Sequence, residues 1–361
     1  MISFALTEEQ EIARATAADF ARSVLSATAR ATDEAAALPA TLQATAWALG
    51  LVQTIADAGP GSLEQPTVLN ALMLEELARG DAAAAVAIAA PLGFVKAVAD
   101  QGTERQRQEL LPLFAADAPR LAAIAYVDVG WFQGAARPTT ATKVAGGFRL
   151  EGVKGLIPLA SRCSHVLVTA ESDVGAQAFI VPMESNGVTV HPPRGTLGLR
   201  ALAMADVALD SVFVADSARL GEDSVADVQR IVDQSRVALS AILSGLSRAV
   251  LDAALPYTKE RVVHGQAIAK KQSVAFKIAD MHIAIEAMRW MGLRAATEID
   301  ARQPATRSAR LAQVYASNAA VRIADEGVQI FGGHGFVRDL PLEMWYRNAR
   351  SLSVLDGLVG A

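Results

Sequence analysis

The sequence predicts an α+β protein in which a helical region, a β region and a second helical region follow one another along the chain. Three observations lead to this prediction. Residues 1–120 carry apolar residues at helical spacing, residues 121–222 form short alternating segments, and residues 223–361 return to long helical patterns. The β-α-β alternation that builds a parallel sheet is missing from the pattern. We therefore expect a helical N-terminal domain, a central β-barrel domain and a C-terminal four-helix bundle over these three ranges.

The N-terminal region opens with a clear helix start. Thr7 is followed three residues later by Gln10, the spacing of a capping box, and an amphipathic pattern continues through Leu25. Gly80 and Gly102 are expected to end helices. Further helices are expected at Leu38–Leu49, Thr67–Arg79 and Thr103–Ala116.

The central region has the texture of strands. Its segments are short, alternate in polarity and contain β-branched residues, and Gly146-Gly147, Asn186-Gly187 and Pro192-Pro193 separate them as turns. The expected strands are Phe148–Val153, His165–Ala170, Gln177–Pro182, Gly187–His191 and Met204–Val214.

The C-terminal region contains three long helical patterns. They cover Val225–Glu260, Lys270–Arg302 and Ser308–Phe331. Pro304 interrupts the second and third, and Gly332-Gly333 ends the third. Long helices with short connections predict an antiparallel bundle.

Composition gives no reason to expect a nucleic acid, a metal ion or a membrane as a partner. The net charge of −5 gives no electrostatic reason to expect nucleic acid, and the five histidines show no metal-ligand spacing. The apolar stretch Ala82–Pro91 is too short to cross a bilayer, and the first residues show no signal peptide. The single cysteine, Cys163, suits a reducing cytoplasm. We therefore expect a cytoplasmic protein without a metal, a nucleic-acid partner or a membrane span.

Four local stretches carry a family resemblance. They are LEELARGDAAAA (Leu74–Ala85), QGTERQRQELLP (Gln101–Pro112), KERVVHGQAIAKKQSVAFKIADM (Lys259–Met281) and VQIFGGHGFVRDLPLEMWYRNAR (Val328–Arg350). In this order and at this spacing, they resemble the acyl-CoA dehydrogenase family over nearly the whole chain. The resemblance implies the three-part fold already predicted, usually as dimers or tetramers.

The family chemistry explains which side chains matter. In that family, FAD lies between the β domain and the bundle of one subunit, and its adenine end reaches a neighbouring subunit. A glutamate removes the α-proton of the acyl-CoA thioester while the β-hydrogen leaves as hydride to the flavin. The base must be desolvated and aimed, and the developing charge needs preset hydrogen-bond donors.

Residues that match the neighbour-facing half of the flavin site are present. By resemblance, Arg261 pairs with the pyrophosphate, which suits a permanently charged bidentate guanidinium, and Gln272 lies near the adenosine. The run that matches the segment against the adenine end consists of Gln329, Ile330, Phe331, Gly332 and Gly333. The alternatives are a solvated bundle arginine and a simple helix stop.

Residues that would hold the subunit's own flavin are altered. Where the family has Thr-Glu-Pro followed by Gly-Ser, this chain has AYVDVGWFQGAA, so Gly134 and Ala135 offer no hydroxyl. The flavin-stacking tryptophan is replaced by Leu156, and Pro158, which lacks an N–H, replaces a hydrogen-bonding threonine.

The base position is also changed. Asp356 stands where the family has glutamate, and a carboxylate about one ångström short costs roughly 10²-fold in rate. The alternative for Asp356 is a surface carboxylate. Some members place the base before the arginine of an Asp-x-x-Arg element, where this chain has Ser235, which cannot act as a base. Asp233 and Arg236 of that element match substrate-binding positions of the pantetheine tunnel, or form an intrahelical ion pair.

These changes favour a half-site or non-catalytic subunit that shares FAD with another acyl-CoA dehydrogenase-like subunit and acts on an acyl-CoA substrate. The chain thus resembles the degenerate subunit of heteromeric actinobacterial members that act on steroid side-chain thioesters. Two alternatives remain open. One is a homo-oligomer using Asp356 as its base, as nitroalkane oxidases use aspartate at that position, and the other is a flavin-free acyl-CoA-binding scaffold.

Overall fold

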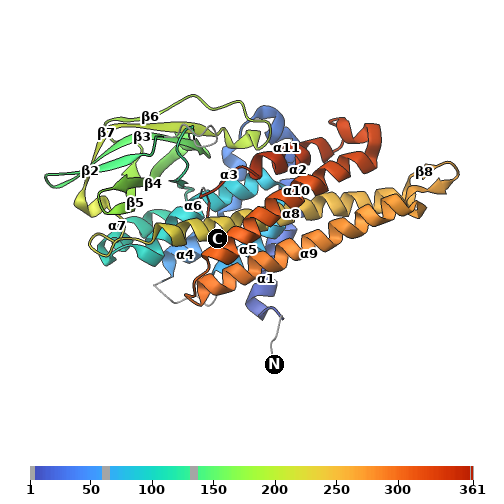
Figure 1. The fold of residues 1–361 in the computed structure, drawn as a ribbon, viewed down its shortest axis with the longest axis horizontal. Helices are drawn as coiled ribbons and strands as arrows, with labels where there is room; N and C mark the ends of the chain where they lie inside the picture. Colours follow the sequence, from blue (N-terminus) through green and yellow to red (C-terminus); the bar gives the residue numbers. More distant parts are fainter. Residues whose placement is uncertain (1–4, 59–65, 131–136, 358, 361) are drawn as a thin grey trace.

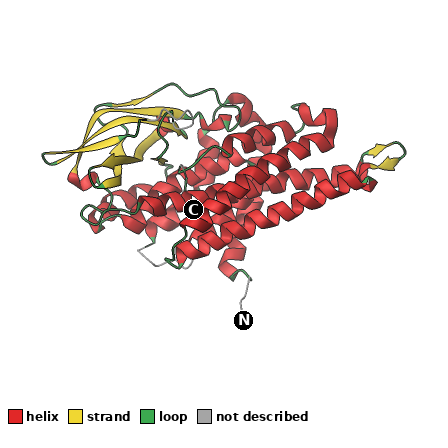
Figure 2. Cartoon of the chain, in the orientation of Figure 1, coloured by secondary structure: helices red, strands yellow, loops and turns green. Residues whose placement is uncertain are grey.

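A computed structural model of the chain describes residues 5–58, 66–130, 137–357 and 359–360. The molecule is elongated, with the sheet at one end and long helices running toward the other (Figure 1). Helices from both ends of the sequence pack side by side between these extremes. The predicted order of helices, strands and helices is confirmed (Figure 2).

The N-terminal helices begin where the sequence places a cap. Thr7 and Gln10 form the predicted capping box, and Thr103 forms a second one with Gln106. The first helix does not stop at Leu25, because a π-helical turn continues into a further helix. The elements are α1 (Glu8–Phe20), the π turn η1 (Ala21–Leu25), α2 (Ser26–Ala35), α3 (Ala40–Trp47), α4 (Leu51–Asp57), α5 (Pro66–Gly80), α6 (Ala82–Gln101) and α7 (Glu104–Ala115).

Helix α6 was not predicted, although its first half was recognised as apolar. It and α8 (Val228–Glu260) are long and apolar enough to cross a membrane. Their apolar windows are 100% and 78% buried inside the protein, as in the core helices of a soluble fold. Because α6 packs against α4, α5, α8 and β1, every face of it needs small or apolar side chains.

The strands form one seven-stranded mixed sheet. The strand order is β1-β4-β2-β3-β7-β6, and β5 pairs with β4. All five expected strands are present, and two further strands, β1 and β2, were not predicted. The strands are β1 (Leu121–Ala125), β2 (Thr140–Val144), β3 (Gly147–Ile157), β4 (Cys163–Ser172), β5 (Gly175–Pro182), β6 (Val188–Val190) and β7 (Ala205–Ala215).

The C-terminal bundle has α8 at its centre. Its other helices are α9 (Gln272–Asp300), α10 (Thr306–Phe331) and α11 (Leu342–Leu352), so the three predicted long helices are confirmed within three residues at each end. A short hairpin of β8 (Val262–Val263) and β9 (Gln266–Ala267) joins α8 to α9 and projects from the end opposite the sheet (Figure 1).

Helix α11 fixes the sheet against the helices. The side-chain oxygen of Asn348 accepts a hydrogen bond from the Leu199 amide at 2.7 Å, and Ser351 accepts one from Gly198 at 2.9 Å. Arg347 donates to both carboxylate oxygens of Asp33 on α2, at 3.0 and 2.7 Å. The sheet, the N-terminal helices and the bundle are therefore held in one arrangement.

Candidate functional site

A cleft of about 520 Å³ lies between the sheet and the bundle. We call it the sheet–bundle cleft. Its sheet side carries Tyr126, Asp128, Lys154 and Thr169, and its helical side carries Gln313 and Asp356. A cleft of this size holds a ring system or a small ligand.

A buried lysine forms the sheet wall of the cleft. The Lys154 ammonium lies 2.9 Å from the Asp128 carboxylate and donates to the Tyr126 carbonyl at 3.0 Å and the Thr169 hydroxyl at 3.4 Å. Burial lowers the pKa of Lys154, and the Asp128 charge opposes that shift. Asp128 also accepts from the hydroxyl of Thr139 at 2.6 Å. These groups satisfy one another, so they offer no free charge to an anionic ligand.

Asp356, the predicted base, reaches the cleft but is held by Arg236. The Arg236 guanidinium donates from Nε to Oδ1 at 3.1 Å and from Nη2 to Oδ2 at 2.8 Å. The Gln313 amide donates to the Leu355 carbonyl at 2.9 Å and fixes the preceding backbone. The Asp356 side chain is 30% exposed, so it is neither a free surface carboxylate nor a fully desolvated base.

The predicted substrate residues Asp233 and Arg236 lie inside the protein. Asp233 is buried and accepts hydrogen bonds from Gln229 at 2.8 Å and Thr306 at 2.6 Å. Its carboxylate lies 3.6 Å from Arg236, the intrahelical pair considered as the alternative. The main partner of Arg236 is Asp356, which the sequence spacing did not indicate.

Tyr126 closes the cleft beside Asp356. Burial raises the pKa of the Tyr126 phenol, and the nearby Asp356 charge raises it further. A phenol in this setting stays protonated near neutral pH and can donate a hydrogen bond.

A second hollow, of about 500 Å³, lies at the hairpin end of the bundle. It gathers five of the seven residues predicted to bind the cofactor: Arg261, Ile330, Phe331, Gly332 and Gly333. We call it the hairpin hollow. The Tyr257 and Phe331 rings stack in its wall, with centroids 4.0 Å apart and planes 12° apart. The other two predicted residues, Gln272 and Gln329, are exposed and lie outside its lining.

The two hollows differ in their fit to a dinucleotide. In the hairpin hollow, Arg261 and His334 are exposed, and the space beside Gly332 and Gly333 is open for at least 4 Å. In the part of the chain that the structure describes, the Arg261 side chain has no hydrogen-bond or ion-pair partner. An unpaired guanidinium beside open glycine backbone suits a diphosphate.

The sheet–bundle cleft has less to offer an anion. Of the carboxylates that line it, Asp128 pairs with Lys154 and Asp356 pairs with Arg236, so Glu171 adds negative charge that no described cation compensates, and this disfavours a diphosphate. It therefore fits an uncharged ring better than the anionic end of FAD.

Only some of the altered positions that would hold the subunit's own flavin lie within the described residues. Leu156 lies on β3 with φ of 59°, and its amide donates to Asp206 at 3.3 Å. Leu156 and Pro158 do not line the sheet–bundle cleft. Gly134 and Ala135 lie outside the described residues.

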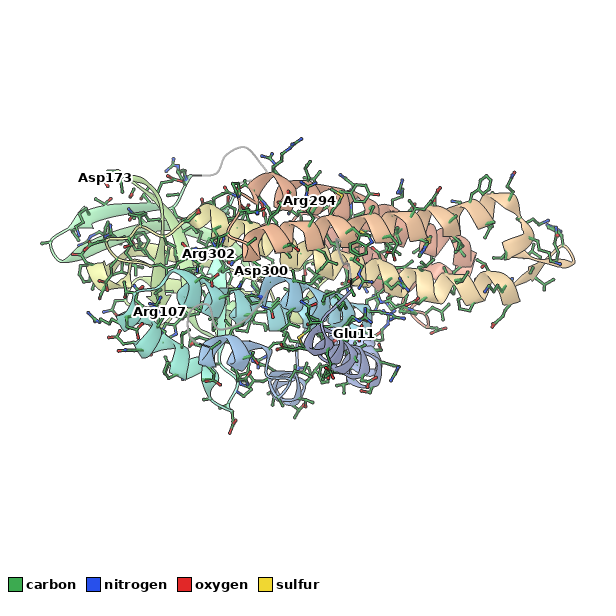
Figure 3. The ribbon with its side chains drawn as sticks, turned by 90° about the horizontal axis from the view of Figure 1, so that it is seen from below. Glu11, Arg107, Asp173, Arg294, Asp300 and Arg302 are labelled. Atoms are coloured by element: carbon green, nitrogen blue, oxygen red, sulfur yellow. The ribbon has the colours of Figure 1, made fainter. Side chains whose placement is uncertain are left out.

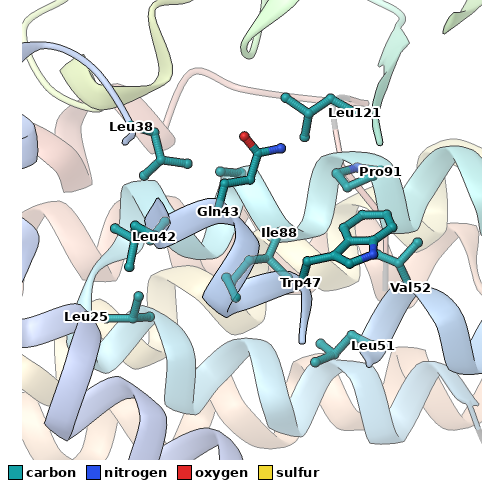
Figure 4. A pocket seen from close by; sticks show the side chains of 13 residues that line it. Leu25, Leu38, Leu42, Gln43, Trp47, Leu51, Val52, Ile88, Pro91 and Leu121 are labelled. Carbon is teal, nitrogen blue, oxygen red and sulfur yellow. The ribbon is translucent and has the colours of Figure 1, made fainter. Parts of the chain in front are cut away.

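A third hollow in the N-terminal helices is apolar and small. Its volume is about 20 Å³, and Leu42, Ile88 and Pro91 point into it, with Gln43 as a polar side chain at its edge (Figure 4). A hollow of this size holds one water at most, so it is a packing defect rather than a ligand site.

Sequence reasoning did not single out Lys154, Asp128 or Tyr126 as site residues. A signal for Lys154 was present, because strand alternation puts it on the buried face of β3 with Phe148 and Leu150. A lysine at an inward position marks a buried polar site.

Comparison with known proteins covers all three parts of the chain. Family profiles match residues 7–118 (acyl-CoA dehydrogenase, N-terminal domain), 129–212 (middle domain) and 225–358 (C-terminal domain). The bovine mitochondrial short-chain specific acyl-CoA dehydrogenase is 30% identical, covering 98% of this chain and 88% of that protein. The probable acyl-CoA dehydrogenase YngJ of Bacillus subtilis is also 30% identical, covering 99% and 96%.

Solved structures agree in fold. The butyryl-CoA dehydrogenase from Megasphaera elsdenii superposes with a TM-score of 0.86 at 27% identity, covering 98% of this chain and 95% of that one. The FAD complex of PigA has a TM-score of 0.87 at 24% identity over the same shares of the two chains. FAD is the cofactor of this fold family, as predicted. From its profiles, its relatives and its fold, the chain belongs to the acyl-CoA dehydrogenase family.

Proposed function

We propose that this chain is a half-site subunit of a heteromeric, cytoplasmic acyl-CoA dehydrogenase, assisting the FAD-dependent α,β-dehydrogenation of an acyl-CoA thioester. One contrast carries the proposal. Asp356, at the base position, is held by Arg236, whereas Arg261, at the neighbour-facing position, has no partner among the described residues.

The position of Arg261 supports a role toward another subunit. The hairpin beside the hairpin hollow and the sheet that forms one wall of the sheet–bundle cleft lie at opposite ends of the long axis (Figure 1). In an assembly, Arg261 would hold the diphosphate of a neighbour's FAD, with Tyr257 and Phe331 beside its adenine. FAD, when bound, supplies the hydride acceptor. The residues of this chain would supply a positive charge to the diphosphate of that FAD and an aromatic surface to its adenine.

The chain's own cleft supports a non-catalytic role. Lys154 is already paired with Asp128, and both oxygens of Asp356 already accept hydrogen bonds from a permanently charged guanidinium. With Glu171 the cleft is acidic, which weakens any flavin diphosphate there.

An exposed apolar face on α9 supports an assembly. Phe276, Ile283 and Trp290 follow at seven-residue intervals and are 60%, 64% and 46% exposed. Leu311 and Val314 on neighbouring α10 are each 49% exposed. Arg294, one turn beyond Trp290 on α9, is labelled in Figure 3. Large apolar side chains exposed together on two adjacent helices are typical of subunit contacts.

Absorbance of the purified chain tests the proposal. We expect no flavin bands from the chain alone, and bands when it is co-purified with a related subunit from its native source. One tightly held flavin per chain without a partner would contradict the proposal.

That outcome would favour the second candidate, a homo-oligomer using Asp356 as its base. The observation in its favour is that the Asp356 side chain reaches the cleft. Absence of flavin under both conditions would favour an acyl-CoA-binding scaffold.

A further inference from the structure

Tyr126 is held in the wall of the sheet–bundle cleft from two sides. It follows β1 directly, and its backbone carbonyl accepts a hydrogen bond from the Lys154 ammonium at 3.0 Å. Its ring packs against the backbone of Gly357, where an added Cβ would lie 2.3 Å from the ring. Gly357 has a φ of 65°, a conformation that glycine adopts without strain. The backbone and the ring of Tyr126 are therefore both fixed in the folded chain.

The hydroxyl of Tyr126 lies near the charged groups of the cleft. After burial, the charges of Asp356, Arg236, Asp128 and Glu171 are what shifts the pKa of this phenol. Three of these groups line the cleft. Among the described residues, the Tyr126 hydroxyl has no hydrogen-bond partner, although the side chain is half-buried. A fixed donor without a protein acceptor is available to a ligand.

The cationic donors at the cleft are already engaged by protein acceptors. The Lys154 ammonium has three acceptors within 3.4 Å, one for each of its hydrogens. Two nitrogens of Arg236 donate to Asp356. Both cations are therefore committed to contacts within the chain.

The other polar side chains of the cleft also donate within the chain. The hydroxyls of Thr169 and Ser353 donate to backbone carbonyls. The amides of Gln229 and Gln313 each give one of their two hydrogens to an acceptor of the chain. Of the described hydroxyl and cationic donors that line the cleft, Tyr126 is thus the one without an acceptor.

A neutral donor beside carboxylates suits a neutral acceptor. A ligand carboxylate in the cleft would meet the negative charge of Glu171, whereas a carbonyl oxygen needs only a donor. We propose that the Tyr126 hydroxyl donates a hydrogen bond to the thioester carbonyl oxygen of an acyl-CoA whose acyl end lies in the sheet–bundle cleft. The ligand class rests on the proposed function. Tyr126 thereby selects ligands that carry an oxygen acceptor at this point.

One variant and two probes isolate this hydrogen bond. Tyr126→Phe removes the hydroxyl and keeps the ring that packs against Gly357. Tyr346→Phe is the matched control, since Tyr346 is a half-buried tyrosine of α11 that does not line the cleft. The probes are butyryl-CoA and S-butyl-CoA, a thioether in which a methylene group replaces the carbonyl group. Calorimetric titration of the full chain measures both affinities.

The two probes should respond differently. Tyr126→Phe should bind butyryl-CoA roughly three- to tenfold more weakly than the wild type and Tyr346→Phe, the effect of one hydrogen bond. Its affinity for S-butyl-CoA should change by less than about twofold, because that probe offers no oxygen there. Infrared spectra of butyryl-CoA labelled with carbon-13 at the carbonyl give a second readout. The bound C=O stretch should lie at lower frequency in the wild type than in Tyr126→Phe, because the hydrogen bond weakens the C=O bond.

Three outcomes would overturn the proposal. Equal butyryl-CoA affinity and equal carbonyl frequency in the wild type and Tyr126→Phe would show that the phenol does not bond the thioester, and would leave the acyl-CoA ligand of the proposed function in place. Parallel weakening of both probes would make Tyr126 a packing residue. Absence of butyryl-CoA binding in the wild type and in both variants would remove the thioester itself, and with it the substrate class of the proposed function. Flavin content in the assembly tests the half-site role separately.

Discussion

The guanidinium of Arg236 on α8 donates hydrogen bonds to both carboxylate oxygens of Asp356, at 3.1 and 2.8 Å. The two residues are 120 positions apart in the chain. A general base needs a free lone pair aimed at the proton it removes. Here the two oxygens are both engaged by a cation that does not deprotonate. The pair therefore fixes the orientation of this carboxylate and occupies one lone pair on each of its oxygens.

The first prediction concerns that carboxylate. Asp356→Asn should change kcat of the complete assembly by less than twofold, because the partner subunit carries the working base. Asp356→Glu should be equally silent. If Asp356 were the base, the asparagine variant would lose the roughly 10²–10⁴-fold that general base catalysis supplies. Steady-state turnover with flavin content measured in parallel decides between the two.

The second prediction concerns Arg261. Arg261→Ala should empty the flavin site of the assembly without lowering the Tm of the isolated chain, because the side chain is exposed and unpaired within the described structure. Losing the partner of a bound charge costs about 2–5 kcal/mol. Arg149→Ala, an exposed arginine on β3, is the matched control. Retained flavin in Arg261→Ala would make this residue a solvated bundle arginine.

The third prediction concerns pH. Asp81 caps α6, accepting a hydrogen bond from the Ala83 amide at 2.9 Å, and burial raises its pKa from 3.8 to about 6. A raised pKa means that the folded chain binds this proton more tightly than the unfolded chain does. The contribution of Asp81 to stability is therefore complete below pH 4 and is lost as pH rises through 6.

Asp81→Asn removes this titration and keeps a good cap. At about 1.4 kcal/mol per pKa unit, the variant should gain about 3 kcal/mol relative to the wild type between pH 4 and pH 7. Urea unfolding at several pH values measures the difference. Asp227→Asn, which replaces the exposed cap carboxylate of α8, controls for the change of cap chemistry. If the free energy of unfolding of Asp81→Asn differed from that of the wild type by the same amount at every pH, this account would be refuted.

The fourth prediction concerns the crossing of α5 and α8. A Cβ on Gly245 would lie 2.0 Å from the Glu75 carbonyl oxygen, so Gly245→Ala should destabilise the fold by about 1–3 kcal/mol. Gly292→Ala, also inside a bundle helix but with room, should be neutral or stabilise by up to about 1 kcal/mol. Similar melting temperatures for the two variants would contradict the close approach.

The sequence predicted the long helices that keep a polar face. Helix α10 was expected over Ser308–Phe331 and spans Thr306–Phe331, since its exposed face preserves the helical period. Helix α6 and strand β1 were missed because both are buried on every side, which removes the period. The domain boundaries after residues 120 and 222 stay predictions.

The positions of some candidate residues were predictable from local motifs. Arg261 and Gly332 follow the C-terminal ends of α8 and α10 and come together in the hairpin hollow, and their role there stays a prediction. The Arg236–Asp356 pair joins residues 120 positions apart, and no local pattern encodes such a contact. Its consequence for the base could only come from the fold.

The all-round burial of α6 has a cost during synthesis. Its covering partner α8 ends at Glu260, about 160 residues after α6 ends at Gln101. At about 5–20 residues per second, the ribosome needs roughly 8–30 s to make that length. For that time a twenty-residue apolar segment lacks its cover, and chaperones and membrane-targeting factors can compete for it. The nascent chain is therefore most exposed to misrouting and aggregation before α8 emerges.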